Sequence, residues 1–146
     1  MAQIYLASPF FNEDQITRIE KVEKALEENS TVKSVFSPRK DDVSEYEEFS
    51  KEWAKVVYKH DITNVEEADY VVAVLDFVGD NVDSGTAYEI GAAVQMGKPV
   101  IIFHENDHPV NLMISESLHA YIKDFDDLKN YDFNTLPSSE YNGKMF

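Results

Sequence analysis

One carboxylate is conspicuous in this sequence because almost all of its neighbours are small or apolar. Residues 83–99 have the sequence DSGTAYEIGAAVQMGKP, which predicts a helix over 84–96 with Gly97 as its C-terminal cap and Pro99 just beyond. A helix that is apolar all round is buried on both sides. We therefore expect Glu89, in the second turn, to be sheltered and available for chemistry. The alternative is an ordinary solvated glutamate, favoured by the helix dipole near the N-terminus.

The chemistry that suits a sheltered glutamate is nucleophilic attack. The helix dipole is expected to keep the carboxylate ionised at neutral pH, which is the form that attacks. On a helical wheel, the face expected to lie on a sheet is formed by Ala87, Ile90, Gly91 and Val94. The opposite side is also nearly free of charged residues, so we expect it to meet another subunit.

Four further polar residues lie at strand ends or helix edges: Tyr5, Asp61, Asp83 and Asn111. Each also has an ordinary structural explanation. Tyr5 could be a core residue, Asp61 and Asp83 could be helix N-caps, and Asn111 could be a turn residue. The four histidines show no metal-ligand spacing, and the aspartates within 76–83 lack the spacing of a calcium loop. The segment FVGDNVDSG matches neither glycine-rich phosphate-binding pattern. We expect no metal and no cofactor.

The elements that must position these residues alternate along the chain. Strands are predicted at 3–7, 32–36, 70–75, 100–103 and 121–122. Helical patterns follow the N-cap Asn12 and cover about 49–57, 84–96, 112–118 and 124–130. This alternation predicts a single α/β domain over residues 1–146. We expect a doubly wound, mainly parallel five-stranded sheet, flavodoxin- or Rossmann-like, with helices on both faces.

Ligands of such sheets bind outside the carboxyl ends of the strands. That edge comprises residues 7–12, 36–46, 76–85 and 104–111.

The composition is that of a globular chain and excludes several classes of protein. Of 146 residues, 43% are hydrophobic and none is cysteine, which excludes disulfides and thiolate metal sites and agrees with a reducing cytoplasm. No apolar run approaches the roughly 20 residues of a membrane span. Thirteen basic residues against 28 acidic ones give a net charge of −15, and without a basic cluster we expect no nucleic-acid binding. A small molecule, neutral or cationic, or a protein partner is expected instead.

Several segments together resemble the nucleoside 2-deoxyribosyltransferase family. They are IYLASPFF (4–11), DITNVEEAD (61–69), DSGTAYEIGAAVQMGKPV (83–100), NLMI (111–114) and YDFN with its following proline (131–137). The resemblance implies a cytoplasmic enzyme of nucleotide salvage that moves 2-deoxyribose from one nucleobase to another, without metal or cofactor. It also implies a homo-oligomer, a hexamer built from dimers, in which a neighbouring subunit completes each site.

The resemblance assigns catalytic roles residue by residue. Glu89 would attack C1′ of a 2′-deoxynucleoside and hold a covalent deoxyribosyl ester. A second base would then attack and restore the configuration, as in retaining glycosidases. Asp61 would protonate the departing base and deprotonate the incoming one, and Tyr5 would orient Glu89.

The remaining candidates would bind the substrate. Asp83 would hold the 5′-hydroxyl end of the sugar, with Asn111 and the C-terminal carboxylate, here on Phe146, from a neighbouring subunit. The side chains expected to pack against base or sugar are Phe10, Phe11 and Met113.

Three features depart from the family or refine the resemblance. The loop over about 37–47 is short, so the family's base-recognising residue cannot be placed. The chain ends in Phe146, where family members often end in tyrosine, so any role of that hydroxyl is absent. The segments ASPFF and DSGTAYEIG look closer to the purine-restricted branch, and purines are therefore the expected bases.

Two alternative functions stay open. A nucleoside 5′-monophosphate N-glycosidase of the same superfamily is expected to carry a serine six residues before its glutamate to receive the phosphate. Asp83 occupies that position and would repel a dianion, although Ser84 and Thr86 at a helix N-terminus could favour an anion. The other alternative is a non-catalytic sensor that binds a nucleoside or nucleotide. The presence of Glu89, Asp61 and Tyr5 together argues against it.

Overall fold

The five strands lie side by side in one sheet, and all neighbouring strands run parallel. In the computed structural model, which describes residues 1–146, the strand order is β2-β1-β3-β4-β5. The strands are β1 (Ala2–Ala7), β2 (Val32–Phe36), β3 (Tyr70–Val74), β4 (Val100–Phe103) and β5 (Ala120–Ile122). The helices are α1 (Glu13–Glu27), α2 (Lys51–Glu67), α3 (Ser84–Gln95), α4 (Leu112–Ser115) and α5 (Phe125–Asn130), with a 3-10 turn η1 (Pro38–Lys40). The direction of winding reverses between β1 and β3, where such sheets bind their ligands.

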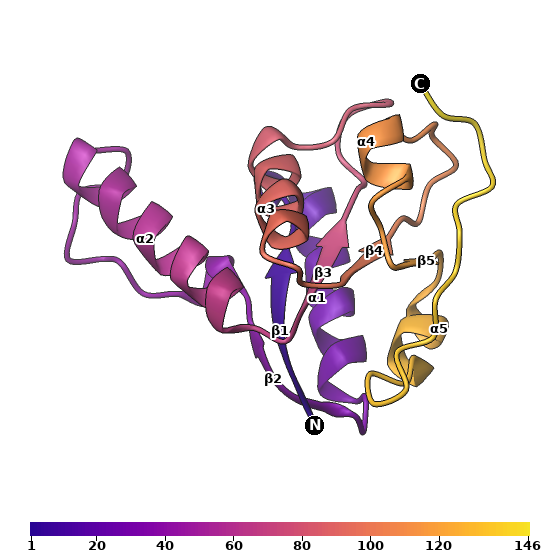
Figure 1. Cartoon of the computed structure of the whole chain (residues 1–146). Coiled ribbons are helices and arrows are strands. Elements are labelled where there is room, and N and C mark those ends of the chain that lie inside the picture. Colours follow the sequence, from indigo (N-terminus) through magenta and orange to yellow (C-terminus); the bar gives the residue numbers. More distant parts are fainter.

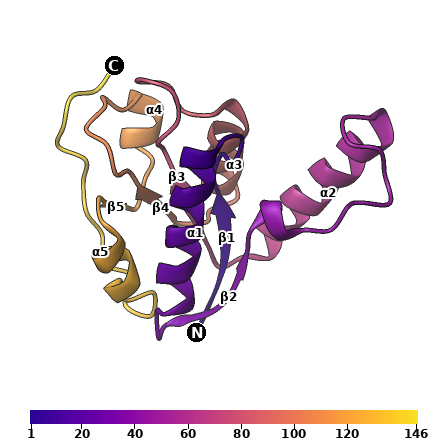
Figure 2. The same cartoon turned by 180° about the vertical axis from the view of Figure 1, so that it is seen from behind.

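Helices cover both faces of this sheet (Figure 1, Figure 2). On one face α1 and α5 pack against the strands, and their core residues include Ile19, Leu26 and Leu128. On the other face α2, α3 and α4 contribute Val65, Ile90 and Ile114. The predicted α/β fold with a parallel five-stranded sheet is confirmed. None of the helices combines the length and apolarity that a membrane span requires.

Local sequence signals determine the two elements next to the site. The last four residues of β3, in the run YVVAV, are all buried, as expected for a central strand covered on both faces. The side chain of Asp83 caps α3 by accepting a hydrogen bond from the Thr86 amide. The helix ends where Gly97 adopts φ +76, and the amides of Gly97 and Lys98 bond back to carbonyls of the last turn, which is the pattern of a Schellman motif.

The second helix, α2, is longer than predicted and projects from the sheet. Ser50 caps it by accepting a hydrogen bond from the Trp53 amide at 3.1 Å. Val65 is its one buried residue, and its N-terminal half extends away from the rest of the protein (Figure 1). Asp61 therefore lies inside this helix, and its alternative interpretation as an N-cap is wrong.

The orientation of α3 differs from the predicted one. The structure buries Thr86, Ile90 and Ala93, whereas Gly91 and Val94, expected to face the sheet, are exposed. Because almost every residue of this helix is small or apolar, the sequence pattern did not distinguish the two orientations. The buried Thr86 hydroxyl is satisfied by the capping carboxylate at 3.0 Å, so its polarity does not oppose burial.

Candidate active site

Glu89 and Tyr5 meet where the winding of the sheet reverses. Tyr5, on β1, is fully buried, and its hydroxyl donates a hydrogen bond to Oε2 of Glu89 on α3. Phe36, the last residue of β2, stacks on the Tyr5 ring with 5.7 Å between centroids. The phenol is therefore fixed by packing, and it holds the carboxylate in one orientation.

Burial dominates the ionisation of Glu89. Removal from solvent raises the pKa of its carboxyl group to about 7; the Tyr5 hydrogen bond lowers this pKa, and the charges of Asp61 and Asp83 raise it further. Burial thus acts against the expected effect of the helix dipole, and the pKa of Glu89 lies above its ordinary value rather than below it. The desolvation of a half-buried carboxylate outweighs a dipole that acts within the first turn.

Asp61, on α2, lies close enough to Glu89 for their charges to interact. Its own pKa is raised to about 6, first by burial and then by the charge of Asp41, while His60 lowers it. His60 in turn bonds to Asp41, with 2.8 Å between Nδ1 and Oδ2. A carboxyl group with a pKa near neutrality can both deliver and accept a proton at working pH, as a general acid and base must.

Both carboxyl groups line a cavity of about 600 Å³. Phe10 and Phe11, which follow β1, stack on each other at 5.6 Å and contribute to its wall. Trp53 and Phe49, at the start of α2, also line the cavity and meet edge to face at 5.1 Å. The volume suits a ligand of nucleoside size, and the aromatic surface suits a flat heterocycle.

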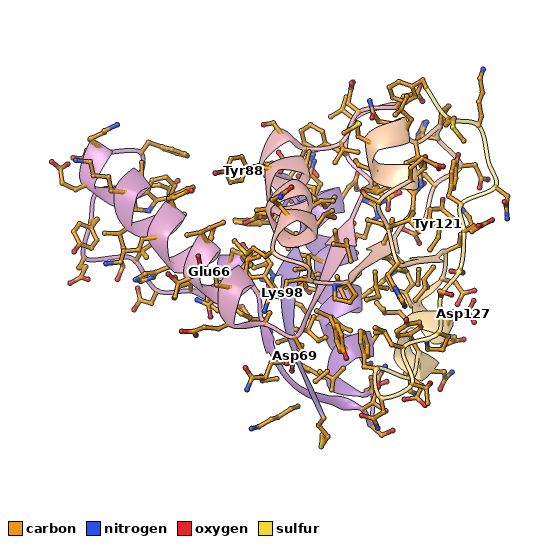
Figure 3. All side chains as sticks on the ribbon, in the orientation of Figure 1. Glu66, Asp69, Tyr88, Lys98, Tyr121 and Asp127 are labelled. Atoms are coloured by element: carbon orange, nitrogen blue, oxygen red, sulfur yellow. The ribbon has the colours of Figure 1, made fainter.

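A second opening, of about 460 Å³, reaches Asp61 and Glu89 from between α2 and α3. Tyr58 and Tyr88 border it, and their hydroxyl groups lie 3.0 Å apart. Tyr88 stands on the side of α3 that faces α2 (Figure 3). The two helices that carry Asp61 and Glu89 are thus joined directly beside these carboxyl groups.

Asp83 both caps α3 and lines the Glu89 cavity, so the N-cap interpretation and a place in the candidate site are compatible. Its Oδ2 atom accepts from the amide and the hydroxyl of Thr86, at 2.9 and 3.0 Å. The same side chain lines the Glu89 cavity. A carboxylate that caps a helix through one oxygen is held rigidly, and its other oxygen stays available to a ligand.

Asn111, Met113 and Phe146 lie elsewhere. They line a different cavity of about 530 Å³, bordered by α3 residues such as Gly91 and Val94, and none of the three lines the Glu89 cavity. The Phe146 backbone is tied to this region, because its main-chain oxygen accepts a hydrogen bond from the Leu112 amide at 2.8 Å. Within one protomer these three residues are therefore separate from Glu89.

Among the cavity residues that the sequence analysis did not name as site candidates are Arg39, Phe49 and Trp53. Arg39 and Phe49 lie in the connection between β2 and α2, and no sequence pattern predicts how this connection runs past the cavity. Trp53 could have been found, because Trp53, Val57 and Asp61 are spaced four residues apart and share one helix face. All three line the cavity.

No group of three or more histidine, aspartate or glutamate side chains is arranged to hold a metal ion. The four histidines bond instead to single partners: Asp41, Tyr121, Asp80 and the Leu136 carbonyl.

Comparison with known proteins identifies the family. The sequence profile described as nucleoside 2-deoxyribosyltransferase matches residues 4–131. The chain belongs to the nucleoside 2-deoxyribosyltransferase family. The sequence-based identification of this family of pentosyltransferases is therefore confirmed.

Individual members of the nucleoside 2-deoxyribosyltransferase family agree. A nucleoside deoxyribosyltransferase of Limosilactobacillus fermentum is 34% identical over 147 residues, which cover 90% of this chain and 86% of that protein. The solved structure of a 2-deoxyribosyltransferase from Bacillus psychrosaccharolyticus is 45% identical and has a TM-score of 0.87, covering 96% of this chain and 99% of its own. A 2-desoxiribosyltransferase from Leishmania mexicana, 24% identical with a TM-score of 0.57 over 75% of this chain and 69% of that one, shares the fold.

Proposed function

We propose that this protein transfers 2-deoxyribose between nucleobases, preferring purines, by a retaining double displacement. The observation that carries the proposal is the hydrogen bond from Tyr5 to Glu89, next to the carboxyl group of Asp61 in one cavity. Family membership supports the class of substrate, because the related proteins are named for this transfer.

The first displacement forms a covalent intermediate. A carboxylate oxygen of Glu89 attacks C1′ of a 2′-deoxynucleoside, the bond from C1′ to the base nitrogen breaks, and its electron pair leaves with the base. In the second displacement a nitrogen of the incoming base attacks C1′ and the ester electron pair returns to Glu89. Two inversions at C1′ retain the original configuration.

Asp61 and Tyr5 assist these steps. Asp61 delivers a proton to the departing base and removes one from the incoming base, which contributes about 10²–10⁴-fold to the rate; its raised pKa supports this role. Tyr5 donates to one oxygen of Glu89 and leaves the other free for attack. This hydrogen bond also favours the ionised carboxylate that burial disfavours.

The sugar is held by residues of two subunits in this proposal. The free oxygen of Asp83 accepts the 5′-hydroxyl group, and a neighbouring subunit contributes Asn111, Met113 and the C-terminal carboxylate of Phe146. Their separation from Glu89 within one protomer supports a shared site in a homo-oligomer. Apolar side chains that are exposed beside them also support an interface here: Val94, Met96 and Leu112.

The preference for purines rests on the sequence likeness around residues 83–91 and on the breadth of the aromatic wall. Phe10 and Phe11 pack against the base, and Trp53 offers a further surface within the same cavity. Comparable turnover of thymidine and deoxyinosine would overturn this preference.

One incubation tests the proposed reaction. With deoxyinosine and free adenine the protein should produce deoxyadenosine and hypoxanthine. Hypoxanthine with free deoxyribose alone would indicate a hydrolase related to the nucleoside 5′-monophosphate N-glycosidases, and no product would indicate a binding protein. Either result would refute transfer.

A Glu89→Ala variant is the matched control for the covalent step. Alanine is a good helix former, so the fold should persist, and deoxynucleoside binding should persist through Asp83 and Asn111. Transfer should fall by several orders of magnitude. Intact wild-type protein given deoxynucleoside without acceptor should gain the mass of one deoxyribosyl unit, and the variant should gain none.

A further inference from the structure

Arg39 is the one cationic side chain among the fifteen residues that line the Glu89 cavity. Five carboxylates line the same cavity: Asp41, Glu48, Asp61, Asp83 and Glu89. Arg39 does not pair with any of them; its ion pair is with Glu23, a residue outside the cavity. The roles proposed for Glu89, Asp61 and Tyr5, and for Asp83 in holding the sugar, leave this arginine unexplained.

The Glu23 carboxylate holds the Arg39 guanidinium in a fixed orientation. Nε and Nη2 of Arg39 donate to the two oxygens of Glu23, at 3.1 and 2.5 Å. Glu23 is 4% exposed, and it also accepts from the Ser37 hydroxyl at 2.7 Å. A carboxylate that is buried and bonded three times is a rigid support, so the arginine side chain has little freedom left to lose when a ligand binds.

This arrangement leaves one edge of the guanidinium for the cavity. An arginine has five N–H groups in a planar fork, and Glu23 occupies the Nε–Nη2 edge. The Nη1–Nη2 edge carries two parallel donors without a protein acceptor. In a cavity lined mainly by carboxylates and aromatic rings, these donors suit an acceptor on a ligand that lies flat against the rings.

The nucleobase is the part of the proposed substrate that offers such an acceptor. Arg39 follows Phe36 by three residues, Phe36 stacks on Tyr5, and Arg39 lines the same cavity as Glu89. The purines differ at position 6, where hypoxanthine and guanine carry a carbonyl oxygen and adenine carries an amino group that donates. A carbonyl oxygen has two lone pairs and can accept from both N–H groups of the free edge.

We infer that Arg39 selects 6-oxopurines over adenine by donating two hydrogen bonds to O6 of the base, and this inference rests on the proposed transfer reaction. When the base departs, negative charge develops on the ring and on O6. The fixed guanidinium stabilises that charge without rearranging, so it assists departure as well as binding. Adenine presents its amino group to the same donors and gains nothing from them.

The rate constant kcat/KM for the donor nucleoside isolates this effect. In a double displacement it reports only the formation of the intermediate, whatever base accepts the sugar later. In wild-type protein kcat/KM should be higher for deoxyinosine and deoxyguanosine than for deoxyadenosine. Arg39→Met should lower the two 6-oxo values by about 10- to 100-fold and leave deoxyadenosine unchanged.

Arg39→Met also leaves Glu23 buried without its partner, so two further variants keep the test independent of folding. Arg39→Lys retains the charge pair with Glu23, but a lysine has no second pair of parallel N–H donors to offer the base. This variant should therefore lose the preference for 6-oxopurines to a similar extent. Lys40→Met is the matched control: Lys40 lies 3.8 Å from Glu23 but does not line the cavity, so the preference should persist.

Three outcomes would overturn the inference. Equal losses for all three donors in Arg39→Lys would show a general structural role, and an unchanged preference would show no contact with O6. A loss confined to deoxyinosine 5′-monophosphate, with deoxyinosine unaffected, would show that Arg39 binds a phosphate. If the wild-type protein transfers deoxyribose but any of these three outcomes is found, the proposed function stands and only the role of Arg39 is refuted. If the wild-type protein transfers no deoxyribose at all, the proposed function itself is refuted.

Discussion

The hydroxyl of Tyr5 donates to Oε2 of Glu89, and this bond joins the first strand of the sheet to a helix 84 residues further along the chain. It opposes the effect of burial, because a hydrogen bond to the ionised form lowers the pKa that desolvation raises. The reactivity of Glu89 in the proposed reaction therefore depends on Tyr5, and the dependence can be measured.

Replacing Tyr5 with phenylalanine should slow transfer most strongly at acid pH. Without the hydrogen bond the pKa of Glu89 rises above its present value of about 7, so less of the ionised nucleophile exists below that pH. We expect kcat/KM to fall about 10- to 100-fold at neutral pH.

A pH profile distinguishes this cause from a packing defect. The reaction needs Glu89 ionised and Asp61 protonated, so the wild-type profile should be a bell whose two apparent pKa values, near 6 and 7, belong to the pair. In Tyr5→Phe the loss should be larger at pH 5.5 than at pH 8.5, and the maximum should move to higher pH. A uniform loss across the range would contradict the role given to Tyr5.

Glu89→Gln should stabilise the protein at alkaline pH. The folded pKa of about 7 lies above the ordinary value of 4.5, so the folded state binds a proton more tightly than the unfolded state. The destabilisation caused by the ionised carboxylate is absent below pH 4.5, grows as the pH rises towards 7, and is complete above it. A shift of this size corresponds to about 3 kcal/mol.

Thermal unfolding at two pH values provides the measurement. Glutamine still accepts a hydrogen bond from Tyr5, so packing is conserved. The variant should unfold at a higher temperature than wild type at pH 8.5 and at nearly the same temperature at pH 4.5. The opposite order at pH 8.5 would mean that the ionised carboxylate stabilises the fold.

Asp61→Asn should slow transfer by about 10²–10⁴-fold for ordinary bases, because the departing base no longer receives a proton. A donor whose leaving group needs no proton, such as 4-nitrophenyl 2-deoxyriboside, should lose much less. The ratio of the two losses is the measurement. Equal losses for both donors would place Asp61 in substrate binding rather than proton transfer.

Mixing two inactive variants should restore activity if the site is shared between subunits. Glu89→Ala lacks the nucleophile and Asn111→Ala lacks the group contributed to the neighbour. In a mixed dimer one of the two sites combines the intact Glu89 of one subunit with the intact Asn111 of the other. Random co-assembly should therefore recover about a quarter of wild-type activity. Failure to recover any, or full activity in a monomer identified by light scattering, would refute a shared site.

The sequence predicted the fold well because its strongest signals are local. The run YVVAV in β3, the cap Asp83 and the terminating Gly97 define their elements without help from the rest of the chain. The face that α3 presents was predicted wrongly, because Ala93 and Val94 are both apolar and only the packed sheet decides between them.

The candidate site was predictable only as far as family motifs reach. Glu89, Asp61 and Tyr5 lie within such motifs, and the structure brings the three together. The ionisation of Glu89 was not predictable, since it depends on how much solvent three separate elements exclude. Arg39 was missed for a similar reason: its position depends on Glu23, sixteen residues earlier, and on the course of an irregular loop.

The protein contains a single tryptophan, and that residue, Trp53, lines the same cavity as Asp61 and Glu89. Its indole emission consequently comes from one position in the molecule, beside the place where a purine ring would stack. Occupancy of the cavity can thus be followed by intrinsic fluorescence, without an attached label and without turnover. The same signal gives binding constants for the inactive Glu89→Ala variant, where no product could be measured.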